Sequence, residues 1–256
     1  MEPVRKEIIL SNGMKRPWYE YKSPLIAGEE KAPIVFCLHG GEGDGYHAFE
    51  CGNLKETADK YPMIIVSPFI DDVPRSFDIR PESECITIAK EFYDRICMEY
   101  EGQYNRIFVM GYSIGEFLAF QLCRKYNGLV DAFAGAVAPA PPETYCDQNG
   151  RYIFYPEQKG IPVFLWRGIK DYLYAVFTTG HEDKEVQEEV VNGYKHYWEA
   201  WNGARNPKKE ENQKFIIETY EQCSQPMMHV LAKGMGHSDE AEVFEMAWEI
   251  LFSKFV

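Results

Sequence analysis

The chain has 256 residues, 45% of them hydrophobic and 15% aromatic, which suits one large globular domain with a substantial core, and we expect residues 1–256 to form a single domain. Its 27 basic and 40 acidic side chains give a formal net charge of −13. Because an acidic surface repels phosphate backbones and anionic lipids, the charge argues against nucleic acid and membrane surfaces as partners.

Apolar runs alternate with helical patterns along the first half of the chain. The chain begins with a predicted hairpin, residues 6–10 and 18–21, around the turn Ser11-Asn12-Gly13. We then expect strands at 33–38, 63–67 and 106–110, and helices at 53–60, 82–100 and 114–126.

The second half continues the same alternation. We expect strands at 133–138, 162–166, 214–220 and 228–232, and helices at 184–201 and 240–255. Asn202-Gly203 is a helix-stop signal, and the last two strands are able to pair with each other. Strands separated by helices predict an α/β fold, with a mostly parallel central sheet and helices on both faces.

Ligands of such sheets bind at the carboxyl ends of the strands, so the residues that directly follow each strand are the candidates for function. These residues are His39, Gly40, Gly41, Ser113, residues 139–142, Asp171 and His237.

Ser113 lies in the sequence GYSIG, which matches the G-x-S-x-G pattern of a nucleophile elbow in the expected strand–turn–helix setting. In such a turn the serine backbone is strained, and side chains at Gly111 and Gly115 would collide with the neighbouring strand and helix. The hydroxyl is then exposed at a helix N-terminus, where partial positive charge favours a developing anion. We therefore expect Ser113 to be a nucleophile.

A serine hydroxyl needs a general base, and the chain offers six histidines. His237 follows the last strand and precedes the last helix, which is the order that this type of site requires, and it is the predicted base. The other five histidines are less suited to be the base. His39 belongs to a predicted oxyanion loop, and His229 lies inside a predicted strand. His196 lies in a predicted helix, and His47 and His181 lie in loops.

A carboxylate must hold the imidazole in the right tautomer, and in this order it lies between the serine and the histidine. Asp171, just after the strand at 162–166, is the predicted acid. Asp147 comes too early, in an apparent insertion, and Asp183 belongs to the charged run EDKE, which is typical of a solvated face.

The HGG motif that ends at Gly41 is typical of an oxyanion loop, because glycines let backbone N–H groups approach a tetrahedral oxyanion. We expect the amides of Gly41 and Ile114 to form the oxyanion hole. The glycines at 41–45 fit neither phosphate-loop spacing, and no His, Cys and carboxylate cluster has metal-ligand spacing. We therefore expect no cofactor and no metal.

In this order, HGG, GYSIG, Asp171 and GMGHS resemble the α/β-hydrolase superfamily over nearly the whole chain. The lead-in SNGMKRPWYEYKSP, the segment HYWEAWNG and the loop GMGHS are similar to the esterase group that includes feruloyl esterases and polyhydroxybutyrate depolymerases. The resemblance implies Ser113 as nucleophile, Asp171 as acid and His237 as base, acting on a small-molecule ester.

The chain departs from that group at two places. Glu116 lies where the group often has a small residue, and a carboxylate there suits the helix dipole but would oppose a nearby oxyanion. Asp239-Glu240 follow the histidine–serine pair where the group often has Trp-Pro. Two aromatic-rich segments, 145–155 and 172–177, are able either to wall a substrate pocket or to fill the core.

Seven cysteines without a CxxC pair, several of them in apolar runs, predict reduced thiols rather than a disulfide framework. The N-terminal segment has no apolar stretch typical of a signal peptide, and no stretch approaches the roughly 18 apolar residues of a spanning helix. We therefore expect a cytoplasmic protein.

The sequence thus predicts a serine carboxylic-ester hydrolase that works through a Ser-His-Asp triad and an acyl-enzyme, on feruloyl, acetyl or other short acyl esters. A peptidase or thioesterase with the same triad is the nearest alternative. A non-catalytic α/β-hydrolase scaffold that binds a small molecule or a protein is an alternative of a different class, favoured by Glu116. The oligomeric state stays open.

Overall fold

A computed structural model describes residues 1–28, 30–41, 43–70, 84–126, 128–137, 139–155, 159–237 and 242–256, without the side chain of residue 51. The strands are β1 (Val4–Ile9), β2 (Lys15–Lys22), β3 (Ala32–Leu38), β4 (Ile64–Pro68), β5 (Tyr104–Tyr112), β6 (Ala132–Ala136), β7 (Val163–Gly168), β8 (Arg205–Glu211), β9 (Phe215–Gln222) and β10 (Met227–Ala232). The helices are α1 (His47–Cys51), α2 (Leu54–Lys60), α3 (Glu84–Glu99), α4 (Ile114–Lys125), α5 (Leu173–Thr179), α6 (Lys184–Asn202) and α7 (Glu242–Ile250), with 3-10 turns η1 (Pro142–Thr144) and η2 (Phe252–Phe255).

Within the described residues, ten strands form one sheet in the order β1-β2-β4-β3-β5-β6-β7-β10-β9-β8. The neighbours from β4 through β3, β5, β6 and β7 to β10 pair in parallel. Both edges are antiparallel: β1 and β2 extend the sheet beyond β4, and β9 and β8 extend it beyond β10. The predicted hairpin at the start of the chain and the predicted pairing of the last two strands are therefore confirmed.

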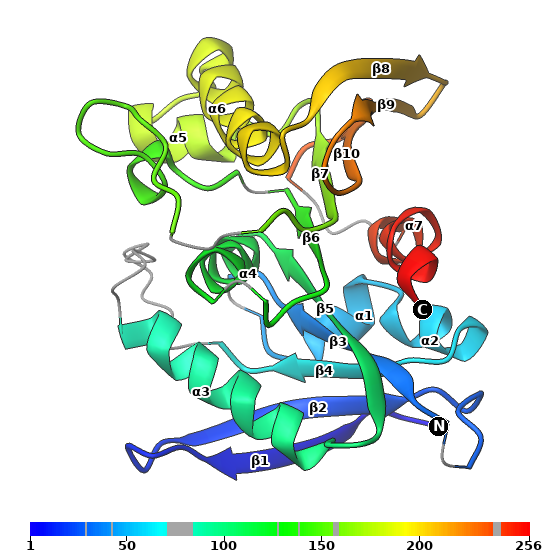
Figure 1. The fold of residues 1–256 in the computed structure, drawn as a ribbon. Coiled ribbons are helices and arrows are strands. Elements are labelled where there is room, and N and C mark those ends of the chain that lie inside the picture. Colours follow the sequence, from blue (N-terminus) through cyan, green and yellow to red (C-terminus); the bar gives the residue numbers. More distant parts are fainter. Residues whose placement is uncertain are drawn as a thin grey trace.

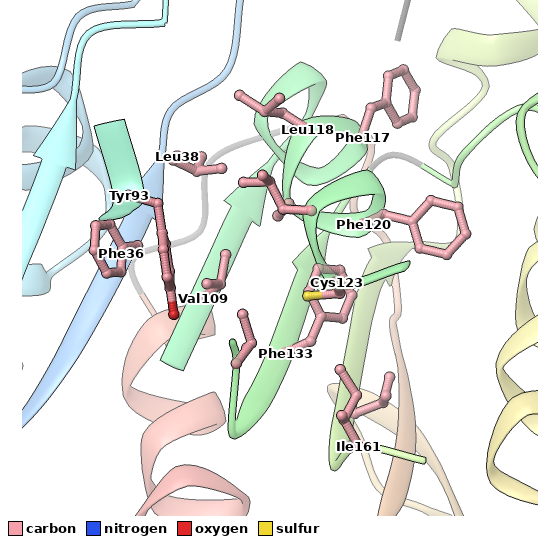
Figure 2. Close-up of a cluster of buried hydrophobic side chains, with 14 of the residues drawn as sticks. Phe36, Leu38, Tyr93, Val109, Phe117, Leu118, Phe120, Cys123, Phe133 and Ile161 are labelled. Carbon is pink, nitrogen blue, oxygen red and sulfur yellow. The ribbon is translucent and has the colours of Figure 1, made fainter. Parts of the chain in front are cut away.

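Helices cover both faces of this sheet (Figure 1). One apolar cluster joins the sheet to α3, α4 and α6, and a second cluster on the opposite face joins it to α2 and α7. In the first cluster, Phe36 of β3 stacks on Tyr93 of α3, while Leu118 and Phe120 belong to α4 (Figure 2). The fully apolar strands fit this arrangement, since parallel strands that are covered on both faces have no solvent-facing side.

Three short elements were not expected from the sequence: α1, α5 and β8. Every residue of β8 is exposed, and its sequence RNPKKEE has no apolar residue that could signal a strand. Charges and a proline suit an edge strand, because they oppose pairing with another sheet edge. The first two residues of the helix expected at 82–100, the last of the strand expected at 133–138 and the first two of the helix expected at 240–255 lie outside the described residues.

None of the described helices is long and apolar enough to cross a membrane. In the part of the chain that the structure describes, His, Cys and carboxylate side chains do not gather in groups of three or more able to hold a metal ion.

Candidate active site

The turn from β5 to α4 holds Ser113 in a strained backbone conformation, with φ 52° and ψ −121°. A Cβ at Gly111 would overlap the backbone of residues 115 and 116, and a Cβ at Gly115 would overlap the carbonyl of Leu38 at the end of β3. The Ser113 N–H also donates to Ala136 O at 2.9 Å, which ties the turn to β6. Glycine is therefore required at positions 111 and 115, because neighbouring backbone atoms leave no room for a Cβ. The turn places Ser113 at the carboxyl end of β5.

The structure brings the side chains of Ser113, His237 and Asp171 together in one hydrogen-bonded chain. The Ser113 Oγ lies 3.0 Å from His237 Nε2, and His237 Nδ1 lies 3.0 Å from Asp171 Oδ2. An ionised carboxylate only accepts hydrogen bonds, so Nδ1 carries the proton and Nε2 is left to accept from the serine hydroxyl. Asp171 is 1% exposed, whereas 24% of the His237 side chain is accessible, so the imidazole alone reaches the solvent side.

Asp171 is fixed in place by its own turn and by the loop that carries His237. Its Oδ1 accepts from Leu173 N–H at 3.2 Å and so caps the first turn of α5, which leaves Oδ2 for the imidazole. Lys170 N–H donates to Met235 O at 2.7 Å, and a Cβ at Gly168 would overlap that same loop. The end of β7 and the loop after β10 are thus held side by side.

The two rival aspartates have other partners. The Asp183 Oδ1 accepts from Glu185 N–H at 3.0 Å and Val186 N–H at 3.1 Å, so this residue is the N-cap of α6 rather than part of an unattached charged run. The Asp147 Oδ1 accepts from the backbone N–H groups of residues 149 and 151, and these bonds lower the pKa of Asp147. Among the described residues, the carboxylate that pairs with His237 is that of Asp171.

The HGG loop is oriented by its own histidine. Ile70 N–H donates to His39 Nε2 at 3.1 Å, so the proton of the neutral ring is on Nδ1, which donates to Gly40 O at 2.7 Å. His39 is 3% exposed and is used as a positioning residue rather than a base. A Cβ at Gly40 would lie 3.3 Å from the Ser113 Cβ, which shows how closely the loop passes the serine.

A cavity of about 670 Å³ opens beside Ser113 and His237 and has both Gly41 and Ile114 in its wall. Ile114 is the first residue of α4, so its amide is one of the first-turn N–H groups that have no partner inside the helix. Val137 also lines the cavity and has φ 68°, an uncommon conformation for a β-branched residue. Strained residues of this kind concentrate at functional sites.

The aromatic segments flanking the acid strand divide between the two uses expected for them. In α5, Leu173, Tyr174 and Phe177 line the cavity. In contrast, Tyr145 and Tyr152 pack against the ring of Tyr197 in the core. Five further lining residues have no signal in the sequence, because their patterns are those of ordinary loop, strand and helix positions: Phe117, Val137, Glu143, Thr178 and Gln187.

Glu116, whose role the sequence leaves open, is 3% exposed and does not appear in the wall of this cavity. A Cβ at Gly135 would overlap its carboxylate, so the side chain points toward β6, and it lines a small separate cavity with Arg167, Tyr194 and His229. Burial raises the pKa of Tyr194, and the neighbouring Glu116 carboxylate raises it further. The carboxylate is thus accommodated behind the elbow, away from the open side of Ser113.

No family model matches this chain. A curated relative, proline iminopeptidase PfmaB from Pestalotiopsis fici, is 24% identical over 168 residues, which are 63% of this chain and 55% of the relative. The chain therefore spans about half the length of that relative.

Solved structures resemble the whole chain. Acetyl xylan esterase from Aspergillus awamori has a TM-score of 0.63 at 13% identity, with 96% of this chain and 98% of that chain covered. The poly(3-hydroxybutyrate) depolymerase LpqC from Bordetella parapertussis has a TM-score of 0.66 at 12% identity, with coverages of 96% and 90%. The feruloyl esterase module from Clostridium thermocellum has a TM-score of 0.63 at 13% identity, with coverages of 96% and 85%. The chain has the α/β-hydrolase fold, which confirms the predicted fold class.

Proposed function

We propose that this protein is a serine hydrolase that cleaves carboxylic esters through an acyl-enzyme. The observation that carries the proposal is the chain Ser113–His237–Asp171, with 3.0 Å at each link, at the wall of the 670 Å³ cavity. A serine hydroxyl is a weak nucleophile, and this arrangement provides what it lacks: a base within hydrogen-bond distance and a carboxylate that orients the base.

In the first half of the proposed reaction, the Ser113 Oγ attacks the ester carbonyl carbon while His237 Nε2 takes the hydroxyl proton. The carbonyl oxygen becomes an oxyanion that the amides of Gly41 and Ile114 receive, assisted by the positive end of α4. The C–O bond to the alcohol then breaks, and the imidazolium, stabilised by Asp171, protonates the leaving alkoxide. The alcohol departs and the acyl group stays on Ser113.

In the second half, water takes the place of the alcohol. His237 Nε2 removes a proton from the water, the hydroxide adds to the acyl carbon, and collapse of the oxyanion releases the acid and restores the Ser113 hydroxyl. Every proton in this cycle moves between Ser113, His237, water and the substrate. The names of the structural neighbours support an ester substrate, since two of them are esterases.

A peptidase is the second candidate, and the curated relative named as a proline iminopeptidase favours it. The same groups would act, with His237 protonating an amine in place of an alkoxide. Turnover of a proline arylamide and of a matched aryl ester of the same acyl group distinguishes the two. We expect kcat/KM to be higher for the ester; faster turnover of the arylamide would make the protein a peptidase.

Labelling by a fluorophosphonate probe tests the nucleophile. We expect one adduct per chain on the peptide that contains Ser113, and none in Ser113→Ala. Thr178→Ala is the matched control, because Thr178 also carries a hydroxyl and lines the same cavity. If the probe modifies neither Ser113 nor any other residue of the native chain, the non-catalytic scaffold replaces the hydrolase.

A further inference from the structure

The cavity wall contains a buried polar side chain that the proposed mechanism does not use. Gln187 lies in the first turns of α6, is 2% exposed, and lines the cavity together with Ser113 and His237. Its Oε1 accepts from Ala175 N–H at 3.0 Å, so it satisfies one of the first-turn amides of α5. This hydrogen bond fixes the side chain between two helices.

The same hydrogen bond fixes which end of the Gln187 amide is the oxygen. A backbone N–H can only donate, so the atom at Ala175 must be the oxygen, and the NH₂ group is the end that remains. Among the described residues, no acceptor lies within hydrogen-bond distance of Nε2. A donor that loses water without gaining an acceptor costs free energy, so an occupant of the cavity binds best when it offers an oxygen there.

The charged residues around the cavity restrict which oxygen-containing groups of a substrate can lie near Gln187 Nε2. Glu143 lines the same wall, and no lysine or arginine is among the described lining residues. Burial raises the pKa of Tyr174, and the negative charge of the exposed Glu143 raises it further, so a carboxylate acts on this part of the cavity. A carboxylate or phosphate on the substrate would be repelled, whereas a carbonyl, ether or hydroxyl oxygen would not.

We propose that Gln187 is a specificity-determining residue that donates a hydrogen bond from Nε2 to a neutral oxygen on the part of the ester that fills the cavity. The remaining walls are apolar, with Phe117, Val137 and Leu173, and they hold the hydrocarbon portion. The substrate class is therefore an ester whose acyl or alcohol group carries a carbonyl, ether or hydroxyl oxygen beyond the scissile bond. This inference rests on the proposed ester hydrolysis at Ser113.

Matched pairs of p-nitrophenyl and alkyl esters provide the test. In each pair one ester carries a ketone or ether oxygen at a given chain position and the other carries CH₂ there, and the position is moved outward one atom at a time. At the position that reaches Nε2, we expect kcat/KM to favour the oxygen-bearing ester by about tenfold, the value of one well-made hydrogen bond. A terminal carboxylate at the same length lowers kcat/KM, and Glu143→Gln reduces that penalty.

The variant Gln187→Met removes the donor. Its side chain has nearly the same length and carries no N–H or O–H, so the tenfold preference should vanish, and circular dichroism checks that the fold is retained. Glu188→Gln, at the neighbouring exposed position of α6, is the control and should keep the preference. A merely structural role for Gln187 would lower kcat/KM for both members of a pair equally, and that result overturns the proposal.

The outcomes also separate this inference from the proposed function. If Ser113 is labelled and the CH₂ esters are hydrolysed, but every pair gives a ratio near one, the role of Gln187 is wrong and the hydrolase stands. If Ser113 is not labelled and no ester is hydrolysed, both proposals fail together.

Discussion

Asp147, Asp171 and Asp183 carry the same carboxyl group, and their neighbours give each of them a different role. Asp147 accepts hydrogen bonds from backbone N–H groups within its own turn, and Asp183 is the N-cap of α6. Asp171 uses one oxygen to accept from the first residue of α5 and the other to bind His237. A carboxylate that both caps a helix and orients an imidazole is fixed at two points, so its position is set by the fold rather than by solvent.

Exchange of carboxylate for amide tests this difference. We expect Asp171→Asn to lower kcat for an activated ester by several orders of magnitude, because an amide can donate to Nδ1 and select the wrong tautomer of His237. Asp183→Asn should change kcat less than about threefold, since asparagine is also a good N-cap. Steady-state kinetics of the two variants give the comparison, and inactivation by Asp183→Asn alone would move the acid to residue 183.

At the scale of elements, the sequence predicts best the strands and turns whose residues are buried. The apolar runs of β3, β4 and β7 signal strands covered on both faces, and GYSIG signals the turn between β5 and α4. In contrast, β8 has no apolar residue and exists because β9 offers it a sheet edge. The short helix α5 depends on caps from Asp171 and Gln187, which lie in different segments, so a local pattern could not reveal it.

Helix α4 also anchors the segment that carries Glu143. Its Arg124 is fully buried and donates from Nε to Tyr197 Oη at 2.9 Å, from Nη1 to Gln121 Oε1 at 2.9 Å and to Thr144 O, and from Nη2 to Ile153 O at 3.0 Å. In the described part of the chain no carboxylate forms an ion pair with it. One guanidinium thus satisfies several buried acceptors on both sides of the loop.

Removal of this guanidinium should destabilise the protein. Arg124→Met removes the four hydrogen bonds that the guanidinium donates and leaves the carbonyls of Thr144 and Ile153 with only the long 3.4 Å bonds from Gln121 Nε2 and Tyr197 Oη, so we expect the free energy of unfolding to fall by about 3 kcal/mol. Urea denaturation measures the change. The exposed Arg151→Met in the same segment should cost less than about 0.5 kcal/mol; equal losses in the two variants would contradict the anchoring role.

At the scale of the whole molecule, the sequence was sufficient for the fold class and for the residues at the strand ends, since both follow from an alternation of buried strands and helices. It was not sufficient for the cavity, whose wall is assembled from α4, the end of β6, η1, α5 and α6. Gln187 is a polar residue in a run of charged residues, so the sequence suggests a solvent-facing position, and only the packing of α6 against α5 and η1 buries it at the cavity wall.

The buried His229 of β10 gives the whole fold a dependence on pH. Burial lowers the pKa of His229, and Arg167 and Lys195 lower it further, against the opposing effect of Glu218, whose oxygen lies 3.5 Å from Nδ1. The unfolded chain, with a histidine pKa of about 6.5, therefore binds more protons than the folded one as pH falls below that value. The free energy of unfolding should decrease from about pH 6.5 downward.

Glu218 makes the free energy of unfolding depend on pH in a second, lower pH range. The neighbouring His229 and then Lys195, whose Nζ lies 3.0 Å from the carboxylate, lower the pKa of Glu218 to about 2. The stability that this carboxylate contributes is therefore present above about pH 4.5 and is lost as pH falls toward 2. Urea denaturation between pH 7 and pH 5 isolates the histidine. We expect His229→Gln to flatten the dependence in that range and the exposed His196→Gln to leave it unchanged; the opposite pattern would contradict this assignment.

The central claim is that Ser113 is the nucleophile of an ester hydrolase, and the turnover number of Ser113→Ala tests it most directly. With an activated ester, we predict that kcat falls on the order of 10⁴-fold or more while the far-UV circular dichroism spectrum and the urea midpoint stay close to those of the native protein. Thr178→Ala, which removes another hydroxyl from the same cavity, should keep kcat within a few-fold. Retention of a tenth or more of the native kcat by Ser113→Ala would contradict the claim.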